Sequence, residues 1–286
     1  MKQLSLVICV LLFIFNPVCA QKLDNVQRNS LFAPSGTKAD GNIKEWKDRF
    51  EAYNKSTRIF YTLANDDKYL YLVMQSQISA STNKIMRGGI TFSIKLNGGD
   101  NPVKAAITFP VVTIADTKAL KDALRLPDPT NPEKLTAEQQ AYRRDSIQAA
   151  MMNRRLVAFK FIKAIGIPGI TDSVLSVYNE QGIKAVLKYT KDRNLNYELA
   201  IPLALLGLTA QNPEFNYQIR LNGERPIPIK TNISLPEGVN PSSLVTVYNP
   251  EAATLNGRAV SPLIADILDM INPTYLDGKY KLAVKM

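Results

Sequence analysis

The chain has 286 residues, a formal net charge of +10, no histidine, and two cysteines, Cys9 and Cys19. The absence of histidine excludes Ser-His-Asp triads and histidine-ligated metals, and both cysteines fall within a segment typical of an export signal. We therefore expect a non-catalytic protein without disulfides. The excess of lysine and arginine suits either an acidic partner or a basic solvated surface, and a secreted protein rarely meets nucleic acid.

The first 20 residues are typical of a cleaved signal peptide. Lys2 provides a positive start, residues 4–15 form a nearly unbroken apolar stretch, and Ala20 ends a small-residue cleavage site. The apolar stretch is shorter than the ~20 residues that a bilayer span requires, and a lipid anchor at Cys19 would need a smaller residue before it. We expect cleavage after Ala20 and a periplasmic or extracellular location, with an N-terminal segment at 21–34.

Alternating apolar and polar residues recur along 35–225 and indicate strands with one buried face. Turn-forming residues separate several of these stretches, which predicts hairpins. The alternating segments are 58–64 with 69–75, 90–96 with 103–109, and 183–189, 196–201 and 215–222. Many short strands without a regular helix pattern between them predict a mainly β protein, an antiparallel two-sheet β-sandwich.

A helical insertion is expected at about 116–156. Thr136 and Gln139 match a capping box, and no Gly or Pro follows before Leu156, while a shorter helix is expected at 116–124. The insertion is basic, because it contains Arg143, Arg144, Arg154 and Arg155. These arginines suit either binding of an anionic partner or a helix face exposed to solvent. Three residues are expected to pack on the sandwich: Ile147, Ala150 and Met151.

The segment 226–286 contains seven prolines and little alternation, which predicts an irregular C-terminal arm. Its apolar stretch 263–271 predicts one short helix that docks on the body, since a disordered tail would be poorer in Ile and Leu. A final strand at 280–286 is expected to pack on the sandwich.

Four segments, taken in order, resemble family 9 carbohydrate-binding modules and the DOMON-like domains of secreted bacterial proteins. The opening motif comprises Asp40, Gly41, Glu45 and Trp46. Residues 65–72 are similar to the turn and aromatic strand of that family, 197–207 to its late strand and helix, and Arg220 with Asn222 to its last core strand. The resemblance covers about 35–225. It implies a two-sheet β-sandwich that often binds sugars and sometimes calcium.

The sugar-binding members of that family clamp sugar rings between tryptophans, whereas Trp46 is the single tryptophan here. We expect Trp46 to be a buried core anchor. Tyrosines in or beside loops then become the candidate stacking platforms: Tyr178, Tyr189 and Tyr248. Polar side chains that would complete a glycan site, if the loops bring them together, are Arg87, Asn179, Glu180, Asn222, Glu224 and Arg225.

Acidic residues in two predicted turns are calcium candidates: Asp66 with Asp67, and Asp100. Turn chemistry explains the same residues, so no metal or other cofactor is expected, although calcium stays open. Glu198 is the most tempting carboxylate for catalysis. It lies on a predicted strand, however, and we interpret it as a glutamate on the exposed face of that strand and not as a catalytic group.

Two functions remain open from the sequence. The first is a glycan-binding protein of the cell envelope, which predicts a concave face with tyrosines and hydrogen-bonding side chains. The second is an assembly or protein-interaction module that keeps the fold and uses the basic helix or the proline-rich arm as a docking surface.

Overall fold

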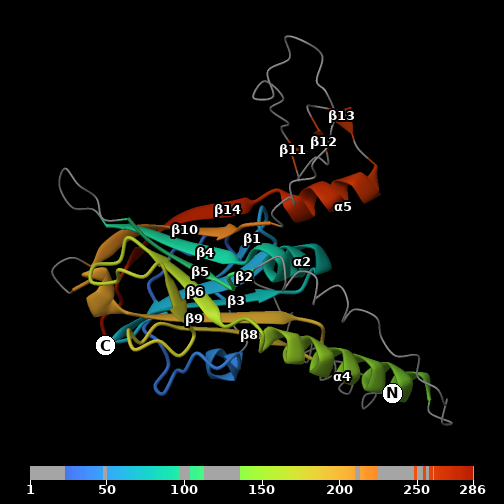
Figure 1. The fold of residues 1–286 in the computed structure, drawn as a ribbon, viewed down its shortest axis with the longest axis horizontal. Coiled ribbons are helices and arrows are strands. Elements are labelled where there is room, and N and C mark those ends of the chain that lie inside the picture. The colour runs from blue at the N-terminus through green and yellow to red at the C-terminus, as the bar shows by residue number, and fades with distance from the viewer. Residues whose placement is uncertain are drawn as a thin grey trace, which may run out of the picture.

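The computed structural model describes residues 23–47, 50–96, 104–112, 136–209, 213–223, 248–249, 254–255, 258–259 and 261–285. Over these residues two antiparallel sheets pack face to face, with helices at their ends and edges (Figure 1). The predicted two-sheet β-sandwich is confirmed. The expected export signal, the helix at 116–124, and Asp100, Glu224 and Arg225 lie outside the described residues.

The first sheet has five strands. In spatial order they are β1 (Ala52–Asn54), β2 (Ile59–Asn65), β3 (Tyr69–Ser76), β9 (Leu195–Pro202) and β8 (Lys184–Tyr189). β2 and β3 form the predicted hairpin, in which Phe60 lies opposite Gln75. Gln75 in turn lies opposite Asn196 of β9, so long-range pairing continues the register that the tight turn sets.

The second sheet has six strands. In spatial order they are β14 (Thr274–Lys281), β10 (Glu214–Leu221), β4 (Ile90–Leu96), β5 (Lys104–Phe109), β6 (Phe161–Ile165) and β7 (Val174–Ser176). β4 and β5 form the second predicted hairpin. The C-terminal arm thus returns to the sandwich as its edge strand β14, although this strand begins and ends earlier than the alternation at 280–286 suggests.

Gly278 occupies a position of β14 that alternates with exposed residues, and its lack of a side chain hid the strand from the apolar pattern. It lies opposite Tyr217, and a Cβ at this position would overlap the tyrosine ring. Val284, which was expected in the strand, follows it and is 81 % exposed.

The main core lies between the two sheets, where alternate residues of each strand are buried. At its centre the hydroxyls of Tyr61 and Tyr217, one from each sheet, lie 3.0 Å apart. A second apolar cluster forms on the outer face of the five-stranded sheet, where residues 31–46 cover part of β3 and β9. Trp46, Ile43 and Tyr71 belong to this smaller cluster.

Within the described ranges three α-helices flank the sandwich: α2 (Ser79–Gly88), α4 (Ala137–Leu156) and α5 (Pro262–Ile271). α5 confirms the helix predicted at 263–271. α2 was not predicted, because its sequence is rich in Ser, Thr and Asn and its N-cap, Ile78, makes no side-chain capping bond. Tertiary packing stabilises it instead: Ile85 and Met86 are buried in the main core.

α4 begins with the predicted capping box, in which Thr136 and Gln139 exchange both hydrogen bonds. It docks against β8 at the edge of the five-stranded sheet (Figure 1). The Asn153 side chain forms two 2.8 Å hydrogen bonds with the backbone of Tyr189, accepting from its N–H and donating to its carbonyl. These bonds determine which face of the helix turns toward the sandwich.

The expected packing of Ile147 and Ala150 on the sandwich was wrong. Both side chains are exposed, Ile147 by 46 %, and Met151 is half-buried. Ala149 and Leu156 are buried in their place, because they lie on the same helix face as Asn153.

Short elements complete the fold. These are the 3-10 helices η1 (Ile43–Trp46) and η2 (Leu203–Leu206) and a small antiparallel sheet of β11 (Tyr248–Asn249), β12 (Thr254–Leu255) and β13 (Arg258–Ala259). None of the helices in the described part of the chain combines the length and apolarity that crossing a bilayer requires.

Candidate functional site

The opening motif folds over the outer face of the five-stranded sheet and is held there by Glu198 of β9. The Glu198 Oε2 atom accepts hydrogen bonds from the backbone N–H groups of Asp40 (3.0 Å) and Gly41 (2.6 Å), and Oε1 accepts one from Nε1 of Trp46 (3.3 Å). Glu198 and Trp46 are only 2 % and 5 % exposed. The core-anchor expectation for Trp46 is confirmed, whereas the exposed-face interpretation of Glu198 was wrong.

Gly41 allows the motif to approach the sheet closely. Its φ of +82° is in the left-handed region, and a Cβ would run into the side chain of Lys188 on β8. Asp40 closes the same turn by accepting the backbone N–H of Asn42 at 2.8 Å. The motif thereby places η1 beside the open part of the sheet.

Burial raises the pKa of Glu198 from its ordinary value of 4.5 to about 7, although the hydrogen bonds that it accepts oppose the shift. A raised pKa means that the folded protein binds the proton more tightly than the unfolded chain. The stability that this group contributes is therefore fully present below pH 4.5 and is lost as the pH rises through 7.

We expect Glu198→Gln to remove this pH dependence. Between pH 4.5 and 7 the free energy of unfolding of the unsubstituted protein should fall, relative to that of the variant, by on the order of 3 kcal/mol. Urea unfolding at a series of pH values measures the difference. Parallel pH profiles for the two proteins would contradict the expectation.

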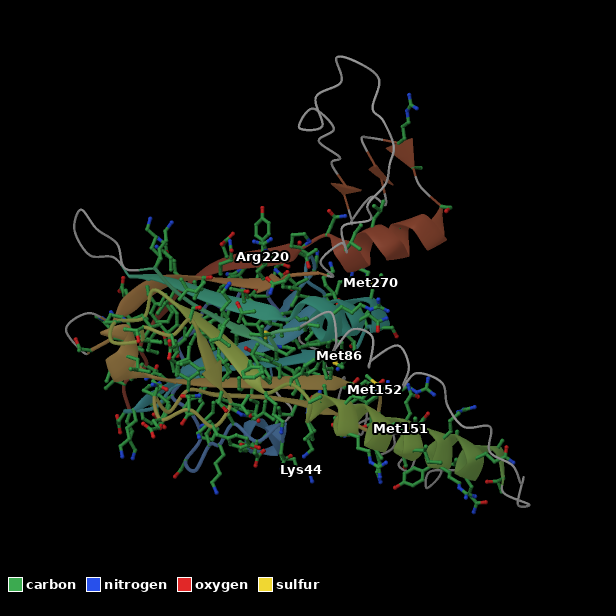
Figure 2. All side chains as sticks on the ribbon, viewed as in Figure 1. Lys44, Met86, Met151, Met152, Arg220 and Met270 are labelled. Atoms are coloured by element: carbon green, nitrogen blue, oxygen red, sulfur yellow. The ribbon has the colours of Figure 1, made fainter. Side chains whose placement is uncertain are left out.

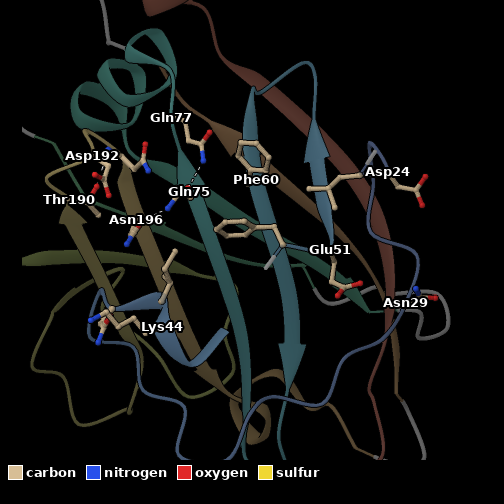
Figure 3. Close-up of a pocket in the computed structure, with 15 residues that line it drawn as sticks. Asp24, Asn29, Lys44, Glu51, Phe60, Gln75, Gln77, Thr190, Asp192 and Asn196 are labelled. Carbon is tan, nitrogen blue, oxygen red and sulfur yellow. Dashed lines mark hydrogen bonds between the residues drawn. The ribbon is translucent and has the colours of Figure 1, made fainter. Parts of the chain in front are cut away.

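A groove with a volume of about 1080 Å³ lies over the part of this sheet that residues 31–46 leave uncovered (Figure 3). η1 forms one wall and the turn between β8 and β9 another, while the N-terminal segment closes the side near β1. The lining residues are Leu23, Asp24, Asn29, Asn42, Ile43, Lys44, Phe50, Glu51, Phe60, Gln75, Gln77, Thr190, Asp192, Asn194 and Asn196.

One row of paired residues crosses the floor of the groove from aromatic to polar. Tyr53 of β1 pairs with Phe60 of β2, Phe60 with Gln75 of β3, and Gln75 with Asn196 of β9. Neighbouring strands lie about 4.8 Å apart. The centroid of the Phe60 ring lies 4.6 Å from the centroid of the Tyr53 ring and 5.7 Å from that of the Phe50 ring. An aromatic cluster therefore stands directly beside a strip of amides.

The amides are ordered by a chain of hydrogen bonds. Gln77 Nε2 donates to Gln75 Oε1 (2.7 Å), Gln75 Nε2 donates to Asn196 Oδ1 (3.0 Å), and Asn196 Nδ2 faces the Gly41 carbonyl at 3.4 Å. Gln75 and Asn196 are buried in the floor, and Gln77 is exposed at the end of the chain. Because each amide has two N–H donors and two acceptor lone pairs, the exposed Gln77 at the end of this chain retains donors and acceptors that a ligand could reach.

The groove is not basic, unlike the chain as a whole. Its described lining residues include three carboxylates, Asp24, Glu51 and Asp192, and one ammonium group, Lys44. Figure 3 shows Lys44 on the wall opposite Asp24 and Glu51. This charge pattern disfavours an anionic ligand and suits a neutral one.

The suggested site residues whose side chains the structure describes do not line this groove and do not come together elsewhere. Glu224, Arg225 and the side chain of Tyr248 lie outside that description. Tyr178 is 78 % exposed in the turn after β7, where Asn179 bonds the carbonyls of Ser176 and Ile183. Tyr189 is the last residue of β8 in the five-stranded sheet, not in the sheet of β7, and it is only 8 % exposed. Its burial raises the pKa of its hydroxyl. Tyr189 thus offers little surface on which a sugar ring could stack.

Arg87 and Asn222 lie at a third place, where α2 meets the end of β10. Asn222 Nδ2 donates to the Gly88 carbonyl at 3.0 Å, and its Oδ1 accepts from Thr91 Oγ1 at 3.1 Å. β10 and β7 are four strands apart, or about 19 Å, so this pair cannot share a small ligand with Tyr178. Glu180 follows the Asn179 turn and is also remote from Arg87.

Asp66, a calcium candidate, is engaged in turn chemistry. Its Oδ1 accepts the backbone N–H groups of Lys68 (2.7 Å) and Tyr69 (2.6 Å), and its Oδ2 accepts the Tyr71 hydroxyl (2.9 Å). Asp67 is exposed beside it. Among the described residues no group of three or more carboxylates, cysteines or histidines is suited to hold a metal.

Sequence reasoning missed Phe60, Gln75 and Asn196. β2, β3 and β9 are buried along nearly their whole length, on both faces of the sheet. Alternation separates the two faces of such a strand, but it does not show which outer-face residues other segments cover and which ones line a groove. The available signal was the polar amide near one end of each of β3 and β9, in strands otherwise dominated by apolar residues.

Comparison with known proteins adds no relative from which a function could be transferred. No family model matches the chain, and neither the curated proteins nor the solved structures include a significant match to it.

Proposed function

We propose that this protein binds a neutral carbohydrate in the groove over the five-stranded sheet. The observation that carries the proposal is the row in which the aromatic Phe60 stands next to the amides Gln75 and Asn196. A sugar ring has apolar C–H faces and a rim of hydroxyls that both donate and accept hydrogen bonds. An aromatic face beside ordered amides matches both properties.

Preorganisation supports the same assignment. The hydrogen bonds between Gln77, Gln75 and Asn196 hold the amides before a ligand arrives, which reduces the entropy lost on binding. The groove is large enough for a ligand of several rings, since ligand pockets commonly measure about 300 to 1,000 Å³. Its carboxylates favour neutral sugars over acidic ones.

A glycan array of neutral and acidic oligosaccharides, probed with and without calcium, tests the proposal. The best-bound glycan is then titrated by calorimetry against Phe60→Ala and Gln77→Ala. Each substitution should weaken binding roughly 10-fold, because one removes the stacking surface and the other an exposed hydrogen-bonding group.

Tyr178→Ala is the matched control, since it removes an exposed aromatic ring outside the groove. It should leave the affinity unchanged. Equal loss of binding in all three variants, or binding that depends on Tyr178 alone, would place the ligand elsewhere. If no glycan on the array is bound, the assembly or interaction role becomes the preferred function. Its first surface to test is α4, on which Tyr142 is 63 % exposed.

A further inference from the structure

The outer face of the six-stranded sheet is open to solvent in the described part of the chain. Alternate residues of β4, β5, β10 and β14 are buried in the core, and those between them point outward. In the middle of the face these are small residues, including Thr91, Ser93 and Ala106. Figure 2 shows Arg220 on this side of the sandwich and Lys44, at the groove, on the opposite side.

Lysines form a row across one end of this face. Lys279 of β14 pairs with Asn216 of β10, Asn216 with Lys95 of β4, and Lys95 with Lys104 of β5. Lys95 and Lys104 are therefore directly opposite each other, an arrangement in which like charges destabilise the sheet. All three lysines are exposed. A surface that retains this repulsion is suited to an anionic partner.

The same face carries three further cations, Arg220, Lys281 and the half-buried Lys163. Its described acidic residues are Glu214, which lies 3.6 Å from Lys281, and Asp277, which accepts a hydrogen bond from Gln218 at 2.9 Å. The described cations outnumber these two carboxylates. Within the described residues no carboxylate is in ion-pair contact with Lys95, Lys104, Lys163, Lys279 or Arg220.

Large apolar side chains flank the cations on this face. Phe161 and Ile165 of β6 and Val174 of β7 are 49 %, 50 % and 48 % exposed, and Tyr275 of β14 is 56 % exposed. β6 and β7 lie at one edge of the sheet and β14 at the other. The face therefore combines positive charge with exposed apolar side chains, most of them at the β6 and β7 edge and one, Tyr275, on β14.

We propose that this face docks the protein on a bilayer that contains anionic phospholipids. Lysines attract the headgroup phosphates, and exposed Phe, Ile, Val and Tyr side chains lower the free energy further when they enter the membrane interface. A soluble polyanion provides no such apolar interface. The face is also broad, with five strand spacings or about 24 Å from β14 to β7, which suits an extended surface. Docking in this way leaves the groove directed away from the lipid, and it does not depend on what the groove binds.

Flotation with vesicles tests the proposal, using the full chain and comparing vesicles of phosphatidylcholine alone with vesicles of equal parts phosphatidylcholine and phosphatidylglycerol. Binding should require phosphatidylglycerol and weaken in high salt, where the Debye length falls to about 3 Å at 1 M. The triple variant Lys95→Glu, Lys104→Glu, Lys279→Glu should lose affinity on the order of 100-fold. Phe161→Ala should lose roughly five- to tenfold.

A second triple variant, Lys55→Glu, Lys184→Glu, Lys188→Glu, makes the same change in net charge at exposed lysines of β8 and of the turn after β1. It should bind within about threefold of the unsubstituted protein, because none of these lysines belongs to the docking face. Every variant keeps the same N-terminus, so the apolar residues 4–15 contribute equally. Equal weakening by both triple variants overturns the proposal. Binding to dextran sulfate that is as tight as vesicle binding and unaffected by Phe161→Ala overturns it in favour of a soluble polyanion.

Discussion

Glu198→Ala is expected to lower the free energy of unfolding by on the order of 3 kcal/mol at pH 5. The substitution removes the acceptor of three hydrogen bonds, from Asp40, Gly41 and Trp46, and leaves the two buried donors, Gly41 and Trp46, without a partner. It also opens a cavity between η1 and β9. Urea unfolding monitored by the fluorescence of Trp46 measures the loss, since the ring of this single tryptophan contacts the altered site.

Glu45→Ala is the matched control. It removes another carboxylate of the same motif, but Glu45 is only half-buried, and its one hydrogen bond, from the Lys38 N–H, is long at 3.4 Å. The control should cost less than about 1 kcal/mol. If the two substitutions have equal effects, Glu198 does not anchor the motif. If Glu198→Ala also abolishes glycan binding while the protein remains folded, the anchored motif is required to shape the groove wall.

Lys84→Met is expected to destabilise the protein by about 3 kcal/mol, because it breaks a buried ion pair. Lys84 of α2 is 2 % exposed, and its Nζ donates to Asp269 of α5 (3.1 Å) and to Thr274 of β14 (3.3 Å). Desolvation lowers the pKa of Lys84, and Asp269 opposes that shift. Removal of the lysine leaves Asp269 buried with Arg58, at 3.3 Å, as its remaining cation.

The double variant Lys84→Met, Asp269→Leu should recover most of the lost stability, since both buried charges are then replaced by apolar groups. Chemical denaturation of the two single variants and the double variant yields the coupling energy. Lys281→Met is the control, because its partner Glu214 is 3.6 Å away and both side chains are more than 60 % exposed. It should cost less than about 1 kcal/mol. An additive double variant would show that the pair does not join α5 to the body.

This ion pair matters for the organisation of the chain. The C-terminal arm is distinguished by its prolines, yet α5 packs on α2 and β14 completes the six-stranded sheet. Lys84 bonds Asp269 and Thr274, which follow it by 185 and 190 residues, and thereby joins α2 to both α5 and β14. The arm is therefore part of the sandwich where β14 pairs with β10.

The sequence by itself determined the fold class and most strand positions. Local patterns were sufficient for this, because alternation and turn residues such as Asp66 act over a few neighbours along the chain. The capping box of Thr136 and Gln139 is likewise a contact within one turn, so the start of α4 was predictable. α2 was not, since its stability comes from burial of Ile85 and Met86 against distant strands.

Only the tertiary structure decided which face each strand presents and which side chains meet. Phe60 and Gln75 become neighbours through the β2 and β3 hairpin, but Asn196 joins them from more than 100 residues away. Glu198 changed from an expected surface glutamate to a buried anchor because residues 31–46 fold back over its face. The physical reason is that alternation specifies two faces of a strand, whereas what covers each face depends on segments that no local pattern can locate.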